Sequence, residues 1–431
     1  MDSPSSTSSS SAGAAAAGAR SSVAPVESGW LRRVPWAGLF ALALVGVADR
    51  WVHRRPATWE ELGRRLEDAP LALVRVEKGI VADRLELLRL EQADATKSRI
   101  IAMGSSRALD GFQFDAVPPE LVVAKIAHGA ITPLEMRLFA REAAALHPAL
   151  FVALLSELDT HRPVRIEPRT GFADLPAVVS LMDAAGPRFV LDDELELERL
   201  STAALFETYR WHDVHLRAWL SSWIDFAPDA DERLPRLVSH ETDEPRVPPP
   251  DVPDLDGILG RFAGTLRRRV SNSHLQMLTS IRVGPHAAVQ ERLFEETVAR
   301  LRAAGAEVLI VEGPLHPVSY ELYDYAATRA EFLAYVEELR ARHGVHFLPL
   351  EESGPWAPED FDDPLHLRPQ RGRELGRLTL EKAGEILGRE LSFEDAKREV
   401  RPRNEPSASG LYDSRGRPIE KGEKKKGKKR D

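Results

Sequence analysis

Five short apolar runs that alternate with helix-forming segments restrict the fold of this chain more than any other feature. Strands this short and this continuously apolar are buried on both faces, which predicts a parallel sheet covered by helices. Helices are expected from Pro133, over 286–304, over 329–342 and after His366. The alternation predicts an open, doubly wound, flavodoxin-like α/β sheet, in which ligands bind beyond the carboxyl ends of the strands. The expected strands are 99–103, 121–127, 150–155, 307–312 and 345–350.

Composition narrows the function. The chain has 431 residues, 43% of them hydrophobic, which suits one large α/β domain, placed at 99–390, with appendages. A net charge of −9 argues against a nucleic-acid partner. The absence of cysteine excludes disulfides, thiolate metal sites and a cysteine nucleophile. No phosphate-binding or zinc motif is present, so no cofactor or metal is expected. His212 and His215 have helical metal spacing, but we interpret them as surface histidines because two ligands do not make a site.

The N-terminal region contains a candidate membrane segment. Residues 1–29 are rich in Ser, Ala and Gly and are expected to be disordered. Two arginines then precede an apolar run that extends over 34–52, with Trp36 and Trp51 near its ends, where an aromatic belt places them. We favour an uncleaved transmembrane anchor at 34–52. A cleavable signal peptide and a buried helix are the alternatives.

Three further segments lie outside the sheet pattern. Residues 57–97 have the apolar spacing of amphipathic helices and are interpreted as a stalk. A long insertion, about 160–285, separates the third and fourth runs. Its helical part is interpreted as a lid and its Pro-rich part as a linker, and 277–283 could add a strand. The basic tail, 396–431, is expected to be disordered, with contact to anionic lipid or polymer as the alternative.

Two short motifs carry the chemistry. Gly104-Ser105-Ser106-Arg107 directly follows the first run, and Asp363-Pro364-Leu365-His366 precedes the last helix. A serine hydroxyl is a weak nucleophile that needs a base within hydrogen-bond reach, and the base needs an acid to hold its tautomer. The motifs predict Ser106 as nucleophile, His366 as base and Asp363 as acid. The alternatives are that Ser106 only caps the following helix and that His366 is an ordinary loop histidine.

With Gly129 after the second run, these motifs resemble the SGNH (GDSL-like) hydrolase superfamily over about 99–160 and 277–390. The variant with Ser in place of the usual Asp, here Ser105, behind an N-terminal anchor, is similar to the membrane-anchored D-alanyl transfer protein DltD and to the alginate O-acetylation proteins. The resemblance implies an oxyanion hole made by the backbone N–H groups of Ser106 and Gly129. It also implies an acyl-ester substrate such as that of an envelope glycan, a membrane acyl-donor protein as a partner, and a membrane-anchored, extracytoplasmic domain.

Other residues near the two motifs have alternative interpretations. Arg107 could steer an anionic substrate or be a solvated charge, and His128 could line the pocket or be structural. Leu158 stands where the family usually has an oxyanion-binding Asn, and loss of such a donor costs roughly two to three orders of magnitude in rate. Ser156 or a residue of the insertion could substitute for it. The alternative function is a catalytically inactive scaffold that binds a glycan or a membrane partner, and a structural envelope protein is a third.

Overall fold

The computed structural model describes residues 36–67, 69–127, 131–161, 206–224, 252, 254–266, 270–282 and 285–393. The chain divides into two compact units, Met1–Val47 and Ala48–Asp431. The sheet and the candidate site belong to the second unit. The disorder expected at 1–29 and 396–431 and the Pro-rich linker at 245–250 lie outside the described residues.

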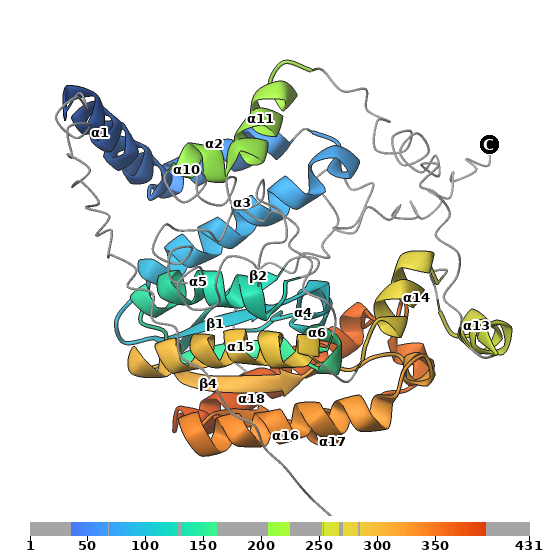
Figure 1. The fold of residues 1–431 in the computed structure, drawn as a ribbon. Helices are drawn as coiled ribbons and strands as arrows, with labels where there is room; N and C mark the ends of the chain where they lie inside the picture. The colour runs from blue at the N-terminus through green and yellow to red at the C-terminus, as the bar shows by residue number, and fades with distance from the viewer. Residues whose placement is uncertain are drawn as a thin grey trace, which may run out of the picture. The chain divides into compact units, whose positions relative to one another are not determined.

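The second unit is built on a five-stranded parallel sheet, which confirms the predicted α/β fold (Figure 1). The strand order is β2-β1-β3-β4-β5, the order of flavodoxin-like doubly wound sheets. Gly104, at the end of β1, pairs with both Ala127 of β2 and Leu154 of β3, so the carboxyl ends of the central strands lie level. The strands are β1 (Ser98–Gly104), β2 (Leu121–Ala127), β3 (Leu150–Leu155), β4 (Glu307–Glu312) and β5 (His346–Leu348).

Helices cover both faces of the sheet. On one face, α3, α5, α15 and α16 share a hydrophobic cluster with the strands, and on the other α4 and α18 do so. Local sequence sets the ends of these helices. Thr132 and Glu135 form a capping box at the start of α5, and Gly344 ends α16 in the left-handed conformation with φ of 65°. The helices are α3 (Leu71–Glu91), α4 (Ser106–Gly111), α5 (Pro133–Ala145), α15 (Pro285–Ala303), α16 (Tyr325–His343) and α18 (Pro369–Ile386).

The helices expected at 57–97 pack against the sheet instead of standing apart from it. Helix α3 lies along the edge strand β2, where the Arg89 guanidinium donates to the carbonyl of Val123 and Glu86 accepts from the N–H of Lys125 at 2.6 Å. These side chains satisfy backbone groups that an edge strand would otherwise expose. Helices α2 (Pro56–Glu67) and α11 (His212–Ser221) form a further cluster with α3, which includes buried Trp59 and Trp211. The short helix α10 (Glu207–Arg210) precedes α11. The helical part of the insertion that we interpreted as a lid therefore packs on α2 and α3.

A helix, α1 (Trp36–His53), forms where the anchor was predicted. Among the described residues, no helix is long and apolar enough to cross a membrane. The last five residues of α1 include Asp49, Arg50 and His53, which interrupt its apolar run. The structure thus gives no support to the predicted transmembrane span at 34–52.

The strand suggested at 277–283 is wrong for the residues described. Helix α14 (Asn272–Thr279) occupies this segment, and Ser271 caps it by accepting the N–H of His274. Leu275 and Leu278, three residues apart, are both buried, which is helical and not strand spacing. The remaining short elements are α6 (Glu157–Thr160), α13 (Leu255–Ala263), η3 (Pro317–Glu321), α17 (Leu350–Ser353) and η4 (Pro358–Asp360).

The contact between α4 and α18 generates a stability prediction. A Cβ added at Gly372 of α18 would lie 1.9 Å from the carbonyl oxygen of Asp110 in α4, so Gly372→Ala must push the two helices apart. We expect it to lower the free energy of unfolding by about 1–3 kcal/mol in urea denaturation. Gly260→Ala is the matched control, because Gly260 lies inside α13 with open space around it and should gain up to about 1 kcal/mol. Equal effects of the two substitutions would contradict the packing argument.

Candidate active site

Ser106 lies at the turn between β1 and α4, at the carboxyl edge of the sheet. The cap of α4 is Ser105, whose side chain accepts the N–H of Arg107 at 3.4 Å, so the alternative in which Ser106 is the cap is wrong. Ser106 is the first residue of the helix. Its hydroxyl is therefore directed to another partner, and its N–H belongs to the first turn, where a helix has no carbonyl of its own to offer.

The partner of Ser106 is His366, 260 residues later in the chain. His366 Nε2 is 2.8 Å from Ser106 Oγ, and His366 Nδ1 is 2.8 Å from both carboxylate oxygens of Asp363. A carboxylate can only accept, so Nδ1 carries the proton and Nε2 accepts from the serine hydroxyl. The structure thus brings the three predicted residues together in the order nucleophile, base and acid.

Asp363 is held in its ionised form. Burial alone would raise its pKa, but the hydrogen bond from His366 and the charges of His366 and His274 hold the pKa well below its ordinary value. Oδ1 also accepts the backbone N–H groups of Leu365 and His366, each at 2.9 Å. These bonds fix the carboxylate against the imidazole. An ionised Asp363 can stabilise the imidazolium that forms when His366 takes a proton.

Two sets of contacts bring the distant motifs together. Helix α18, which directly follows His366, packs on α4 through Gly372, whose carbonyl accepts the N–H of Gln113 at 3.3 Å. The loop after β4 makes hydrogen bonds to the loop that carries His366. The carbonyl of Pro364 accepts the N–H of His316 at 3.1 Å and the hydroxyl of Ser319 at 2.9 Å. Both motifs are therefore fixed by backbone contacts as well as by their own side chains.

Arg107 and Ser156, two predicted substrate-binding candidates, bond to each other inside the protein. The Arg107 guanidinium donates to Ser156 Oγ at 2.8 Å and to Asp159 Oδ2 at 3.0 Å, and also to the carbonyl of Gly313. Arg107 is 4% exposed and Ser156 1%. Ser156 in addition caps α6 by accepting the N–H of Leu158. This arrangement favours a structural role, in which Arg107 connects the segments after β3 and β4 to the turn that carries Ser106.

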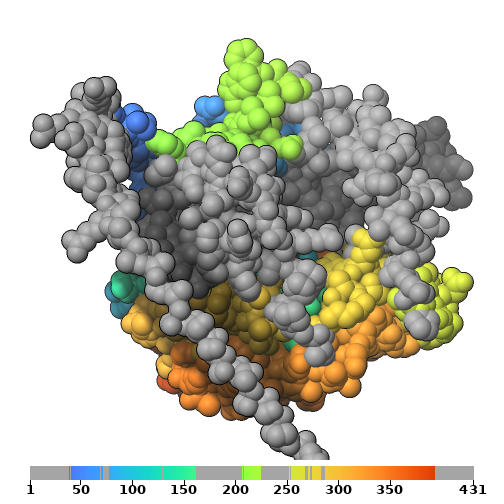
Figure 2. Space-filling model, in the orientation of Figure 1, coloured from blue at the N-terminus to red at the C-terminus, as the bar shows by residue number. Residues whose placement is uncertain are grey.

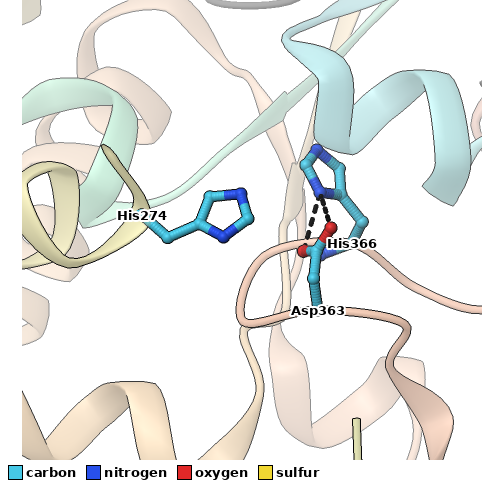
Figure 3. Close-up of side chains that lie close together, drawn as sticks. All are labelled: His274, Asp363 and His366. Atoms are coloured by element: carbon cyan, nitrogen blue, oxygen red, sulfur yellow. Dashed lines mark hydrogen bonds and ion pairs between the residues drawn. The ribbon is translucent and has the colours of Figure 1, made fainter. Parts of the chain in front are cut away.

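The insertion reaches the candidate site through α14. His274, on its first turn, lies beside the Asp363–His366 pair in Figure 3, with its ring centroid 6.4 Å from that of His366. Leu275 and Leu278 of α14 share a hydrophobic cluster with Leu158 after β3 and with Leu365 of the catalytic loop. Leu158, at the position where the resembled family has an oxyanion-binding Asn, is thus buried against the insertion.

Sequence reasoning did not find His274. Its only signal is Ser271 three residues earlier, which marks the start of a helix too short to show a clear period. Gly129 and His128, the other predicted site residues, lie outside the described residues. In the described part of the chain, His212 and His215 do not belong to a group of three or more potential metal ligands, whereas His274, Asp363 and His366 do. His215 instead contacts His53, with their Nε2 atoms 2.8 Å apart.

The chain matches no known protein family by its sequence, and no curated protein matches it either.

Glu157, next to Ser156, gives a pH prediction. Burial raises its pKa from 4.5 to about 7, in spite of a hydrogen bond from Tyr323 at 2.5 Å and the charge of Arg107. A raised carboxyl pKa means that the folded state holds the proton more tightly than the unfolded state. The contribution of Glu157 to stability is therefore greatest below pH 4.5 and falls as the pH rises to about 7, by about 3 kcal/mol in total.

Glu157→Gln keeps an oxygen for Tyr323 but cannot ionise. We expect its advantage over the wild type in urea denaturation to grow between pH 4.5 and 7 and to stay constant above pH 7. Glu337→Gln, at an exposed position of α16, is the control and should follow the wild-type curve. A difference between E157Q and the wild type that does not change with pH would show that folding does not raise the pKa of Glu157, and would contradict the prediction.

Proposed function

We propose that the protein is a serine acyl-hydrolase or O-acyltransferase of SGNH type that acts on an ester bond. The observation that carries the proposal is the relay from Ser106 through His366 to Asp363, with hydrogen-bond distances of 2.8 Å at both links. Nucleophile, base and acid come from two segments 260 residues apart, and their side chains meet at the carboxyl edge of the sheet, where ligands of such folds bind.

The chemistry follows from this order. His366 Nε2 takes the proton of Ser106 as its Oγ attacks the acyl carbon, and Asp363 stabilises the imidazolium. The N–H of Ser106, in the first turn of α4, is one donor to the oxyanion, and the resemblance gives Gly129 as the second. His366 then protonates the leaving alcohol. Water or an acceptor hydroxyl resolves the acyl-enzyme and regenerates Ser106.

The substrate class rests on the resemblance alone. It favours an acyl ester of an envelope glycan, with a membrane acyl-donor protein as partner for the transferase form. Leu158 favours a second candidate, an inactive scaffold of the same fold that binds a glycan or a membrane partner. Leu158 is 1% exposed and offers no side-chain donor to an oxyanion.

A fluorophosphonate probe distinguishes the two candidates, because it reacts only with an activated serine. We expect the wild-type protein to be labelled, Ser106→Ala to be unlabelled, and Asp363→Asn to react roughly 10⁴-fold more slowly because the imidazole loses its tautomer. Ser105→Ala is the matched control. It removes the cap of α4 and about 1 kcal/mol of stability, but it keeps the nucleophile and should be labelled.

Circular dichroism must show that all variants are folded. If folded wild-type protein is not labelled, the scaffold is the correct interpretation. If Ser105→Ala abolishes labelling while Ser106→Ala does not, the assignment of the nucleophile is wrong.

We further propose that the protein is attached to a membrane through α1, with the catalytic domain on the extracytoplasmic side. Large apolar side chains on α1 are exposed, including Phe40, Val45, Val47 and Trp51, and Trp51 is an aromatic residue of the kind that favours the membrane interface. Deleting 1–47 leaves Ala48–His53, whose Asp49 carboxylate accepts the N–H of Thr208, in place. We expect full-length protein in the membrane fraction and the truncated protein in the soluble fraction. Recovery of intact full-length protein in the soluble fraction would refute this attachment.

A further inference from the structure

The candidate site contains one more histidine than the relay uses. One nitrogen of His274, one carboxylate oxygen of Asp363 and one nitrogen of His366 all lie within 4.8 Å of one another. Figure 3 shows the His274 ring directed toward the Asp363–His366 pair from the opposite side of the site. Two imidazoles and a carboxylate are a ligand set that zinc sites of proteins use.

The fold holds His274 in this place. Its backbone N–H donates to Ser271 Oγ at 3.2 Å, which fixes the first turn of α14. The next residue, Leu275, is 3% exposed and belongs to the same hydrophobic cluster as Leu365, the neighbour of His366. Helix α14 and the loop with the Asp-Pro-Leu-His motif therefore share a core. Figure 2 shows α13 and α14, in yellow, at the surface of the unit, and both His274 and His366 are partly exposed.

We propose that His274, Asp363 and His366 form an inhibitory site for a divalent transition metal of the zinc class. Nitrogen ligands favour Zn²⁺ and its neighbours over Ca²⁺ and Mg²⁺, which prefer oxygen. Ligand atoms around tetrahedral zinc lie about 3.4 Å apart, given bonds of about 2.1 Å. The ligand atoms here lie within 4.8 Å of one another, so the set must close by up to about 1.4 Å. Asp363, 1% exposed, supplies a negative charge where water screens it little.

Metal binding and the relay exclude each other. Both carboxylate oxygens of Asp363 lie 2.8 Å from His366 Nδ1, so a metal that binds Asp363 and His366 together binds at Nδ1. The metal displaces the Nδ1 proton to solvent, Asp363 becomes a ligand and no longer orients the imidazole, and His366 cannot act as the base for Ser106. The inhibition rests on the proposed function, whereas the binding does not. A purely structural role for His274 predicts no specific response to zinc.

The binding test uses full-length Ser106→Ala protein, so that no reaction interferes. Isothermal titration with ZnCl₂ should show one site of micromolar or tighter affinity, and CaCl₂ should show none. Adding His274→Ala should weaken zinc binding at least about tenfold. Removal of a group that only supports a metal ligand already lowers metal affinity about tenfold or more, and His274 is proposed as a ligand itself. His346→Ala is the matched control, because it removes a different histidine–carboxylate pair, in which His346 of β5 lies 3.0 Å from Glu307 and neither residue belongs to the proposed site.

The inhibition test uses wild-type protein and the fluorophosphonate probe. Zinc should slow labelling at least tenfold, EDTA should restore it, and calcium should have no effect. The ratio of labelling rates with and without zinc should stay near one in His274→Ala.

The two tests separate the two hypotheses. Absence of zinc binding to Ser106→Ala, or binding that His274→Ala leaves unchanged, overturns the metal site even if the wild type is labelled. Metal-free wild type that is never labelled overturns the proposed function, and the zinc titration of Ser106→Ala remains a valid test of the binding site.

Discussion

The buried guanidinium of Arg107 is the interaction on which the rest of the candidate site depends. It follows Ser106 directly and bonds to Ser156 and Asp159 after β3 and to the carbonyls of Gly313 and Pro314 after β4. A buried charge is costly unless it is paired and fully bonded, and Asp159, 2% exposed in its side chain, provides the pairing. Because one rigid guanidinium bonds to the segments that follow both β3 and β4, the turn that carries Ser106 cannot shift without breaking these bonds.

Further contacts connect Arg107 to the loop that carries His366. Pro314, whose carbonyl Arg107 reaches, lies two residues before His316, and the His316 N–H holds the carbonyl of Pro364 beside His366. His316 is fully buried, and its burial lowers its pKa to about 4, so it stays neutral while it accepts the N–H of Val318. The Arg107 side chain and the His316 backbone thus connect the residue after Ser106 to Pro364, two residues before His366. This explains how two segments 260 residues apart reach hydrogen-bond distance.

The sequence predicted those parts of the site that depend on local pattern. The five apolar runs form the five strands, and the two short motifs contain Ser106, Asp363 and His366. Both could be predicted because a buried strand and an Asp-x-x-His turn are each defined by a few consecutive residues. Arg107 was interpreted as a possible surface group because its partners lie 49 to 207 residues away. His274 was missed for a similar reason, because α14 acquires its position from a cluster with Leu158 and Leu365, distant in sequence. Residues whose roles depend on such contacts cannot be predicted from spacing.

Leu158 links the two proposals. At that position a polar side chain could donate to an oxyanion, and an apolar one can bind the insertion, but one residue cannot do both. Here the leucine is buried with Ile258, Phe262 and Leu275, so the position packs the insertion and offers no side-chain donor. That helix carries His274 to the Asp363–His366 pair. If the proposed function is correct, Leu158 therefore has two effects. It offers no donor to the oxyanion, and it packs against the helix that carries His274 to the Asp363–His366 pair. A modest turnover that responds to a metal ion is the behaviour that this arrangement favours.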